Sequence, residues 1–245
     1  MNLKKKTVFV TGSSRGIGFA IAHAFGQCGY QVVLNGSRNK EQLKQAEAAL
    51  KAEKIPVLAL FGDVSDYAAC EKMFAKIRET FGEVTVLVNN AGISHIGLFT
   101  DMTPAEFQHI LAVNLGSALN CTHLAVPSMV HEKAGVIINI SSMWGEVGAS
   151  CEAVYSASKG GLNAFTKAMA KELGPSGIRV NAISCGVIDT EMNACFSEEE
   201  RAELAEEIPL MRFGRPEEAA DLAVFLAEKA SFVTGKVITM DGGMI

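Results

Sequence analysis

The sequence predicts an α/β fold: a single doubly wound domain in which helices flank a seven-stranded parallel sheet. Short apolar runs alternate along the chain with segments of helical periodicity. The runs are continuously apolar, as strands are when both faces of their sheet are buried. The 245 residues contain no internal repeat, no low-complexity linker and no break in composition, so we expect one domain over residues 1–245.

Strands and helices follow one another in strict alternation. The seven predicted strands read, in order, KTVFVTG, YQVVLNG, PVLALFGDV, VTVLVNNAG, GVIINISS, RVNAISCG and KVITMDGG. Such an alternation builds right-handed strand–helix–strand units, and therefore a parallel sheet of the Rossmann type. The segments with helical periodicity are 16–28, 40–54, 66–82, 104–133, 152–174 and 216–230.

One long segment, residues 187–215, interrupts this alternation after the sixth predicted strand. A long excursion at the carboxyl end of a strand is usually a lid or a substrate loop in this architecture. We therefore expect a substrate loop at about 187–215. The alternative is a helical surface hairpin without a role in the site.

Composition and charge indicate a soluble protein with a large interior. Charged residues make up 20% and the AVILMFWYC class 49%, with a formal net charge of −5. This balance argues against nucleic acid or an anionic membrane as a partner. No apolar run approaches membrane-spanning length. The basic start MNLKKKTVFVTG leads directly into a glycine turn, so we interpret it as a first strand rather than a signal peptide.

The six cysteines, at 28, 70, 121, 151, 185 and 195, show neither CxxC nor Cys/His spacing. We expect free, buried thiols in a reducing compartment, and hence a cytoplasmic protein. The five histidines show no ligand spacing either. The sequence therefore predicts no metal site.

A glycine-rich turn, TGSSRGIG, joins the first strand to the first helix. Gly12 permits a sharp turn, Gly16 lets the backbone approach a pyrophosphate, and Gly18 allows close packing of helix on sheet. The helix then offers its N–H groups and positive dipole end to the phosphates. This context predicts dinucleotide binding.

The second strand ends in VVLNGSRN, without the acidic residue that commonly holds the ribose of NAD. Ser37 and Arg38 stand there instead, and Arg15 lies inside the glycine turn. Two guanidiniums without a carboxylate favour a 2′-phosphate, and therefore NADPH/NADP⁺. The alternative is that Arg38 only caps a loop. At the end of the third strand, Asp63 and Val64 are placed to hold the adenine.

Four further features follow in order: NNAG at 89–92, Asn114, Ser142, and the pair Tyr155 and Lys159 in AVYSASKGG. A tyrosine and a lysine four residues apart are common by chance. Together with the glycine turn, however, these motifs make the chain resemble the short-chain dehydrogenase/reductase family over essentially its whole length. The resemblance implies a fold, a cofactor and a set of catalytic residues.

The resemblance implies that Tyr155 is the catalytic acid and that Ser142 positions the substrate oxygen. A free phenol has a pKa of about 10, and an ammonium one helical turn away favours the phenolate, so Lys159 should lower the pKa of Tyr155. Lys159 should also hold the nicotinamide ribose. Asn114 would hold, through its helix's main chain, a water that links Lys159 to solvent. Ser142 would stabilise the charge that develops on oxygen.

The family usually has Pro-Gly after the sixth strand, but this chain has Cys185-Gly186. Losing the proline should free a backbone donor and loosen the turn. Cys185 either makes the activity thiol-sensitive or is a small replacement for the proline ring. The predicted cofactor-binding residues are Gly12, Ser14, Arg15, Gly16, Ile17, Gly18, Ser37, Arg38, Asp63, Val64, Asn90, Ala91, Gly92, Tyr155, Lys159, Gly186, Ile188 and Thr190.

Within the family, the chain is most similar to the 3-oxoacyl-[acyl-carrier-protein] reductases, through GISHIGLF, PLMRFGRPEEAADLAVFLA and ITMDGGMI. This implies NADPH-dependent reduction of a 3-oxoacyl thioester in fatty-acid synthesis, with acyl carrier protein as partner. The family reads that acidic carrier with basic side chains that flank the active-site mouth. Lys133 matches one of them, whereas Ser176 stands where arginine is usual.

Two other functions stay open. A sibling oxidoreductase could act on a free ketone, a secondary alcohol, a coenzyme A thioester or a steroid-like ring, and an idle member could bind nucleotide only. The segments 104–133 and 152–174 are more apolar than one sheet face requires. The sequence thus predicts an oligomer, and the resemblance implies a homotetramer.

Overall fold

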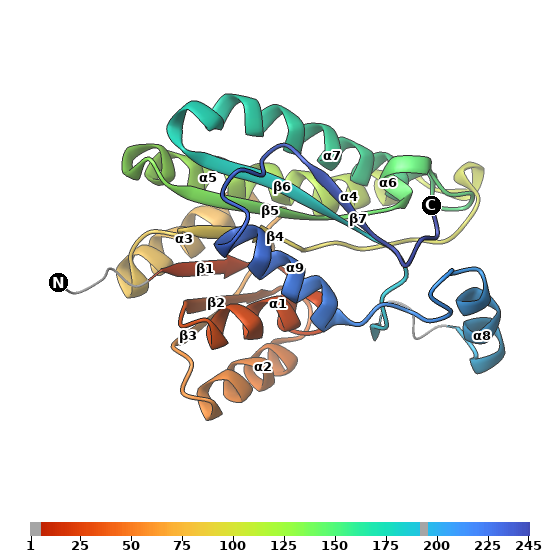
Figure 1. Cartoon of the computed structure of the whole chain (residues 1–245), viewed down its shortest axis with the longest axis horizontal. Coiled ribbons are helices and arrows are strands. Elements are labelled where there is room, and N and C mark those ends of the chain that lie inside the picture. Colours follow the sequence, from red (N-terminus) through yellow and green to blue (C-terminus); the bar gives the residue numbers. More distant parts are fainter. Residues whose placement is uncertain (1–5, 192–195) are drawn as a thin grey trace.

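The computed structural model describes residues 6–191 and 196–245 and confirms the predicted fold class (Figure 1). Seven strands form one parallel sheet in the order β3-β2-β1-β4-β5-β6-β7. The order reverses between β1 and β4, where ligands bind in open α/β sheets. The strands are β1 (Thr7–Val10), β2 (Gln31–Gly36), β3 (Val57–Phe61), β4 (Val86–Asn89), β5 (Gly135–Ser142), β6 (Ile178–Cys185) and β7 (Val237–Met240).

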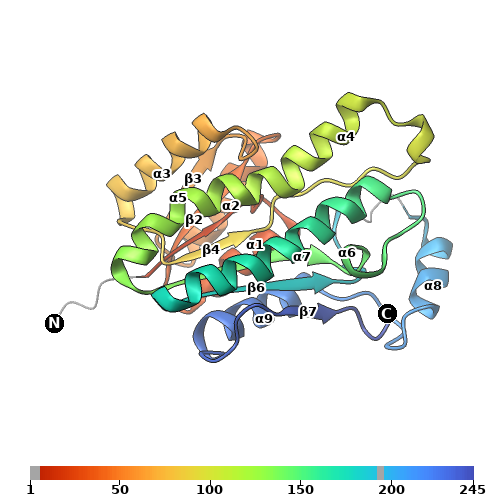
Figure 2. The ribbon, with the colours of Figure 1, turned by 90° about the horizontal axis from the view of Figure 1, so that it is seen from above.

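Helices cover both faces of the sheet, as Figures 1 and 2 show. Val8 and Val10 of β1 belong to one core cluster and Phe9 to the other, because successive strand side chains point to opposite faces. The first cluster is closed by α1 (Gly16–Gln27), α2 (Lys40–Ala52) and α9 (Pro216–Glu228), and the second by α3 (Tyr67–Phe81), α5 (Ser117–Glu132) and α7 (Ala153–Leu173).

Local sequence sets the helix ends. The Asn39 side chain accepts a hydrogen bond from the Gln42 N–H (3.0 Å) at the start of α2. Asp66 does the same for Ala68 (2.9 Å) at the start of α3. The first helix, α1, is different: its N-cap residue makes no side-chain hydrogen bond, and its first turn carries no acid.

The predicted helix 104–133 is interrupted. The structure has α4 (Pro104–Leu111), a π-helical turn (Ala112–Gly116) and then α5. Short π-helical turns inside α-helices often mark functional sites, and the buried Asn114 lies in this one. Among the described residues, the stretch Pro104–Glu132 is long and apolar enough to span a membrane. Because its α5 part contributes to the core beneath the sheet, we interpret it as a core helix.

The segment 187–215 forms an appendage beyond the carboxyl ends of the strands (Figures 1 and 2). A bridge between Ile188 and Gly214 closes its base, and α8 (Glu198–Glu206) lies within it. Residues 192–195, including Cys195, lie outside the described residues. Three short helices were not expected, because three or four residues carry no periodicity: Phe99–Asp101, α6 (Trp144–Val147) and Gly174–Ser176.

The expected burial of the cysteines is only partly correct. Cys70, Cys121 and Cys185 are buried, but Cys28 is exposed and Cys151 is partly exposed. All five described cysteines are free thiols, in agreement with the prediction.

Candidate active site

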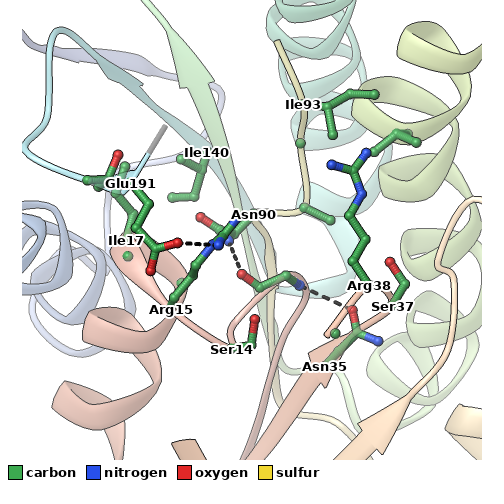
Figure 3. A pocket seen from close by; sticks show the side chains of 18 of the residues that line it. Ser14, Arg15, Ile17, Asn35, Ser37, Arg38, Asn90, Ile93, Ile140 and Glu191 are labelled. Atoms are coloured by element: carbon green, nitrogen blue, oxygen red, sulfur yellow. Dashed lines mark hydrogen bonds and ion pairs between the residues drawn. The ribbon is translucent and has the colours of Figure 1, made fainter. Parts of the chain in front are cut away.

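A cavity of about 440 Å³ opens at the carboxyl ends of the strands, where the strand order reverses (Figure 3). All eighteen residues predicted to bind a cofactor line this cavity, and Ser142 lines it as well. They come from six segments that are far apart in sequence, one of them the helix α7. The fold therefore brings the predicted residues together, while their roles stay predictions.

Two glycines of the first turn are required by close packing. Gly12 has φ +61°, and a Cβ there would lie 2.8 Å from the Cα of Ala91. A Cβ on Gly18 would lie 2.6 Å from the Gly12 carbonyl oxygen. The Asn90 amide donates to that oxygen and to the Thr11 carbonyl, both at 2.9 Å, and so ties the turn to the next loop.

The N-terminus of α1 suits an anionic ligand. Arg15 is its N-cap residue and provides no side-chain cap. Among the described residues, no side chain therefore caps the first-turn N–H groups. This end of the helix fits the pyrophosphate of a dinucleotide. Asn35, which the sequence interpretation missed, accepts from the Gly12 N–H (3.1 Å) and holds the turn; a lone amide in an apolar strand was its signal.

The two arginines predicted to lie near the adenosine, Arg15 and Arg38, both line the cavity, but their surroundings differ. Arg38 extends toward Ile93 in the cavity, beside Ser37 (Figure 3). Arg15 forms an ion pair with Glu191, a residue the sequence interpretation missed. Glu191 directly follows Thr190 in the segment that the sequence predicts to be a substrate loop. This position was the only sequence signal that Glu191 could line the cavity. An acid thus reaches this end of the cavity from a distant segment.

The loop after β3 is fixed by its own side chains. Asp63 Oδ1 accepts from both the N–H and the hydroxyl of Ser65, at 2.9 and 2.8 Å. The Val64 carbonyl accepts from the Asn120 amide (3.1 Å) of α5. Asp63 and Val64 therefore present a rigid edge to the cavity, as an adenine contact requires.

Tyr155 and Lys159 lie one turn apart on α7, and Ser142 faces them from the end of β5. The Ser142 side chain lies close enough to the phenol of Tyr155 to lower the pKa of that group. Lys159 is 4% exposed, and its ammonium donates to the Ile140 carbonyl (2.8 Å). Its Nζ atom is 5.7 Å from the centre of the Tyr155 ring.

The expected lowering of the Tyr155 pKa is wrong for this structure. Burial raises the pKa of the phenol well above its ordinary value; the side chain of Ser142 lowers it, and Glu152 and Cys185 raise it further. Burial also lowers the pKa of Lys159 to about 8. The ammonium points at a carbonyl and is itself poorly solvated, so it does not offset the burial of the phenol. Tyr155 therefore holds its proton at neutral pH.

Asn114 holds the neighbourhood of Lys159 together. Its Oδ1 accepts from the Ile93 N–H (2.8 Å), and its amide donates to the Ile93 carbonyl (2.9 Å) and the Ser158 hydroxyl (3.0 Å). A Cβ on Gly92 would lie 3.5 Å from both Asn114 Oδ1 and Lys159 Nζ. Asn114 thus links the loop after β4 to α7. The water that would link Lys159 to solvent stays a prediction.

Cys185 is the last residue of β6 and is paired in register with Met240. The position therefore continues the sheet, and the expectation of a loosened turn is wrong. Burial raises the pKa of its thiol to about 12, although the charge of Lys159 acts in the opposite direction. A protonated, buried thiol is a weak nucleophile. This favours the alternative in which Cys185 is a small replacement for the proline ring.

A second cavity, of about 700 Å³, adjoins the first at Ser142, Tyr155 and Gly186. Described residues of the segment 187–215 contribute to its wall, and the role of this segment as a substrate loop stays a prediction. The sequence interpretation missed its remaining residues, because their positions depend on which loops meet. Its apolar lining is Ile96, Met143, Trp144, Val187, Phe196 and Leu204.

Lys133 and Ser176 do not flank this mouth. Lys133 directly follows α5, and Ser176 closes the short helix before β6, so both precede the amino ends of strands. A Cβ on the adjacent Gly177 would lie 2.8 Å from the Lys133 carbonyl oxygen. The prediction that Lys133 and Ser176 flank the mouth of the active site is therefore wrong for a single chain. The cavities lie at the carboxyl ends of the strands, which is the opposite edge of the sheet. Within the described ranges, no group of histidine, cysteine and acidic side chains could hold a metal ion.

Comparisons with known proteins agree with this geometry. A family model described as enoyl-(acyl carrier protein) reductase matches residues 12–245. A 3α-hydroxysteroid dehydrogenase from Mediterraneibacter gnavus is 42% identical, over 99% of this chain and 98% of that protein. A 3-oxoacyl-[acyl-carrier-protein] reductase from Staphylococcus aureus is 38% identical, over 98% of both.

A solved structure is also similar to this chain over nearly its whole length. A 3-oxoacyl-[acyl-carrier-protein] reductase from Brucella melitensis superposes with a TM-score of 0.92 at 35% identity, covering 98% of this chain and 91% of that one. The descriptions of these proteins agree on oxidoreductase chemistry. They name different substrates: an enoyl thioester, a 3-oxoacyl thioester and a hydroxysteroid.

Proposed function

The chain belongs to the short-chain dehydrogenase/reductase family, and we propose that it uses NADPH to reduce a 3-oxoacyl thioester to the 3-hydroxyacyl form. The observation that carries the proposal is the junction of the two cavities at Ser142 and Tyr155. NADPH, when bound, supplies the hydride for the carbonyl carbon. The second cavity presents the ketone oxygen to the serine and the tyrosine.

The proton comes from Tyr155. Because burial raises the pKa of this phenol, it is protonated before the reaction and can act as an acid toward the developing alkoxide. The Ser142 hydroxyl, which lines both cavities together with Tyr155, donates to the same oxygen and stabilises its charge. The Lys159 ammonium then stabilises the phenolate that is left.

Proton resupply involves Asn114 and Lys159. Asn114 fixes the loop at Ile93 against α7 beside the Lys159 ammonium. The π-helical turn that contains Asn114 disturbs the regular backbone bonding of the helix, and so leaves room for a carbonyl to bind water. Such a water returns a proton to Tyr155 through Lys159 after each turnover.

NADPH, rather than NADH, is the proposed reductant. The strand-two end offers Arg38 and Ser37 and no acid, and Arg15 lies opposite in the same cavity. A 2′-phosphate that binds Arg15 must compete with Glu191. Arg38 is therefore the principal phosphate ligand in this proposal.

The proposal also covers the carrier of the acyl chain, the cellular location of the enzyme and its oligomeric state. Acyl carrier protein is the proposed carrier because relatives carry that name, and Lys133 and Ser176 give it no support at the mouth. We place the enzyme in the cytoplasm because its described cysteines are all free. Exposed Leu111, Leu119 and Val130 along α4 and α5 support a homotetramer.

The test is NADPH oxidation, followed with acetoacetyl thioesters of N-acetylcysteamine, coenzyme A and acyl carrier protein. We expect turnover with all three and the highest kcat/KM with acyl carrier protein. Turnover of the small thioesters without a gain from the carrier removes only the carrier from the proposal. Inactivity with all three, alongside good activity on a hydroxysteroid, overturns the thioester function.

A second candidate, oxidoreduction of a carrier-free ketone or secondary alcohol, has its own support. The hydroxysteroid dehydrogenase is the more similar of the two relatives described above, at 42% identity. The apolar lining of the second cavity also suits a rigid apolar ring. The same Ser142, Tyr155 and Lys159 serve this reaction in either direction.

A further inference from the structure

The wall of the second cavity is acidic. Four glutamates line it, and no lysine or arginine does among the described residues. Glu152 precedes α7, while Glu200, Glu203 and Glu207 come from α8 and its C-cap. The spacing of three and four residues places these last three on one face of the helix. That face is turned to the cavity that also contains Ser142 and Tyr155.

Nothing described in the structure neutralises this wall. Glu152 accepts a hydrogen bond from Ser94, and Glu200 accepts one from the Ser197 N–H (2.8 Å). Neither partner carries a charge. Glu203 and Glu207 have no ion pair with any described residue. Among the described residues, His95 and Tyr155 are the other ionisable side chains on this wall.

The base nearest in sequence is occupied elsewhere. Arg201 of α8 pairs with Asp189 (2.7 Å) and stacks over the Phe213 ring, 4.7 Å from its centre. It is not part of the cavity wall. The helix therefore directs carboxylates into the cavity and holds its arginine outside.

From this arrangement, which rests on the proposed reductase function, we infer that the second cavity selects ketones that are uncharged or positively charged. A carboxylate or phosphate inside the cavity faces the like charges of the glutamates, and no described lysine or arginine lines the wall to pair with it. An anionic ketone is therefore rejected by repulsion rather than by shape. An acyl chain on the uncharged part of a pantetheine arm satisfies the requirement, and so does a neutral ring ketone.

Trp144 provides a direct reporter of binding. It is the single tryptophan of the chain and lines the second cavity. Its fluorescence can therefore be followed on ligand binding, independently of turnover. This separates the charge preference of the cavity from the catalytic activity.

The experiment compares three N-acetylcysteamine thioesters of a 3-oxooctanoyl chain whose far end carries a methyl ester, a carboxylate or a trimethylammonium. Each is titrated against the Trp144 fluorescence of the full chain with NADP⁺ present. We expect the carboxylate to bind at least about fivefold more weakly than the methyl ester. The trimethylammonium compound should bind as tightly as the ester or more tightly. Equal affinity for the carboxylate and the ester overturns the inference.

Two matched double variants test the origin of the preference. Glu203→Gln with Glu207→Gln removes two charges from the wall. Glu199→Gln with Glu206→Gln removes two charges from the same helix at exposed positions that do not line the cavity. We expect only the first pair to reduce the gap between ester and carboxylate, to about twofold or less. An equal reduction in both pairs overturns the assignment to the cavity wall.

Assays of NADPH oxidation with the same three compounds distinguish a failure of the proposed reductase function from a failure of the proposed charge preference. If NADPH reduces none of the compounds, the thioester function is contradicted, while the Trp144 titration still measures the charge preference. Reduction of all three with equal kcat/KM supports the reductase and overturns the inference. Reduction of the ester and the trimethylammonium compound, with a much lower kcat/KM for the carboxylate, supports both.

Discussion

The two cavities that meet at Tyr155 are built in different ways. The nucleotide cavity is lined by loops that leave the buried strands directly, and hydrogen bonds such as those of Asn90 and Asn35 fix its first turn. The second cavity has one wall made by α8, a helix with no buried residue. The proposed chemistry thus rests on loops fixed by the sheet, and the proposed selectivity rests on an appendage whose helix contributes no buried residue to the core.

The largest expected effect lies at the junction of the cavities. Tyr155→Phe removes the proton donor and should lower kcat by about 10²–10⁴-fold. NADPH affinity should stay within about twofold, because the phenol is not among the residues proposed to hold the phosphates. Stopped-flow kinetics and cofactor titration measure the two quantities. Retained catalysis would remove the phenol from the mechanism.

The nucleotide half should respond next. Arg38→Ala removes the proposed ligand of the 2′-phosphate and should weaken NADPH binding by about 10–100-fold, with little effect on NADH. Arg78→Ala is the control, since that arginine pairs with Glu83 outside both cavities. Isothermal titration with both cofactors measures the difference. Equal weakening of NADPH and NADH would contradict a phosphate contact.

The pH dependence should reflect Lys159. Burial lowers its pKa to about 8, so the ammonium is present below this value and is lost as the pH rises through it. The rate of reduction should therefore fall above pH 8, by up to about tenfold per pH unit. The raised pKa of Tyr155 keeps the phenol protonated over this window, so the fall belongs to the lysine. A rate that stays constant from pH 7 to pH 9.5 would exclude this role.

The smallest effect is expected on the appendage. Ser197→Ala removes the capping box of α8, which is worth about 1 kcal/mol to the helix. KM for the ketone should rise by about two- to fivefold, while the affinity for NADPH is unchanged. Asp66→Ala, which removes a comparable cap from α3 and lines neither cavity, is the control and should leave KM for the ketone unchanged. A parallel loss of NADPH affinity in Ser197→Ala would mean that the two cavities are not independent.

Much of the nucleotide half could be predicted from the sequence. Gly12 and Gly18 predict a tight turn, and the structure gives the reason. A Cβ on Gly12 would meet the backbone of Ala91 in the next loop, and a Cβ on Gly18 would meet the backbone of the turn itself. Tyr155 and Lys159 share a helical face by spacing alone. These predictions rely on local geometry, which short-range sequence patterns encode.

The charge of the site could not be predicted in the same way. The pKa of Tyr155 depends on its burial and on Ser142 and Cys185, which lie at the ends of β5 and β6. Glu191 reaches Arg15 across 176 residues of chain. The place of Lys133 at the far end of the sheet follows from the direction of the strands.

The sequence by itself determined the alternating strands and helices and the glycine turn, because each depends on neighbouring residues, and it supplied the predicted catalytic set. Only the tertiary structure decided that Tyr155 stays protonated, that Arg15 is paired, and that glutamates of α8 line the second cavity. These depend on long-range packing and on the solvation that packing removes. The reaction can be inferred from the order of residues; the substrate it selects depends on which surfaces the fold brings together.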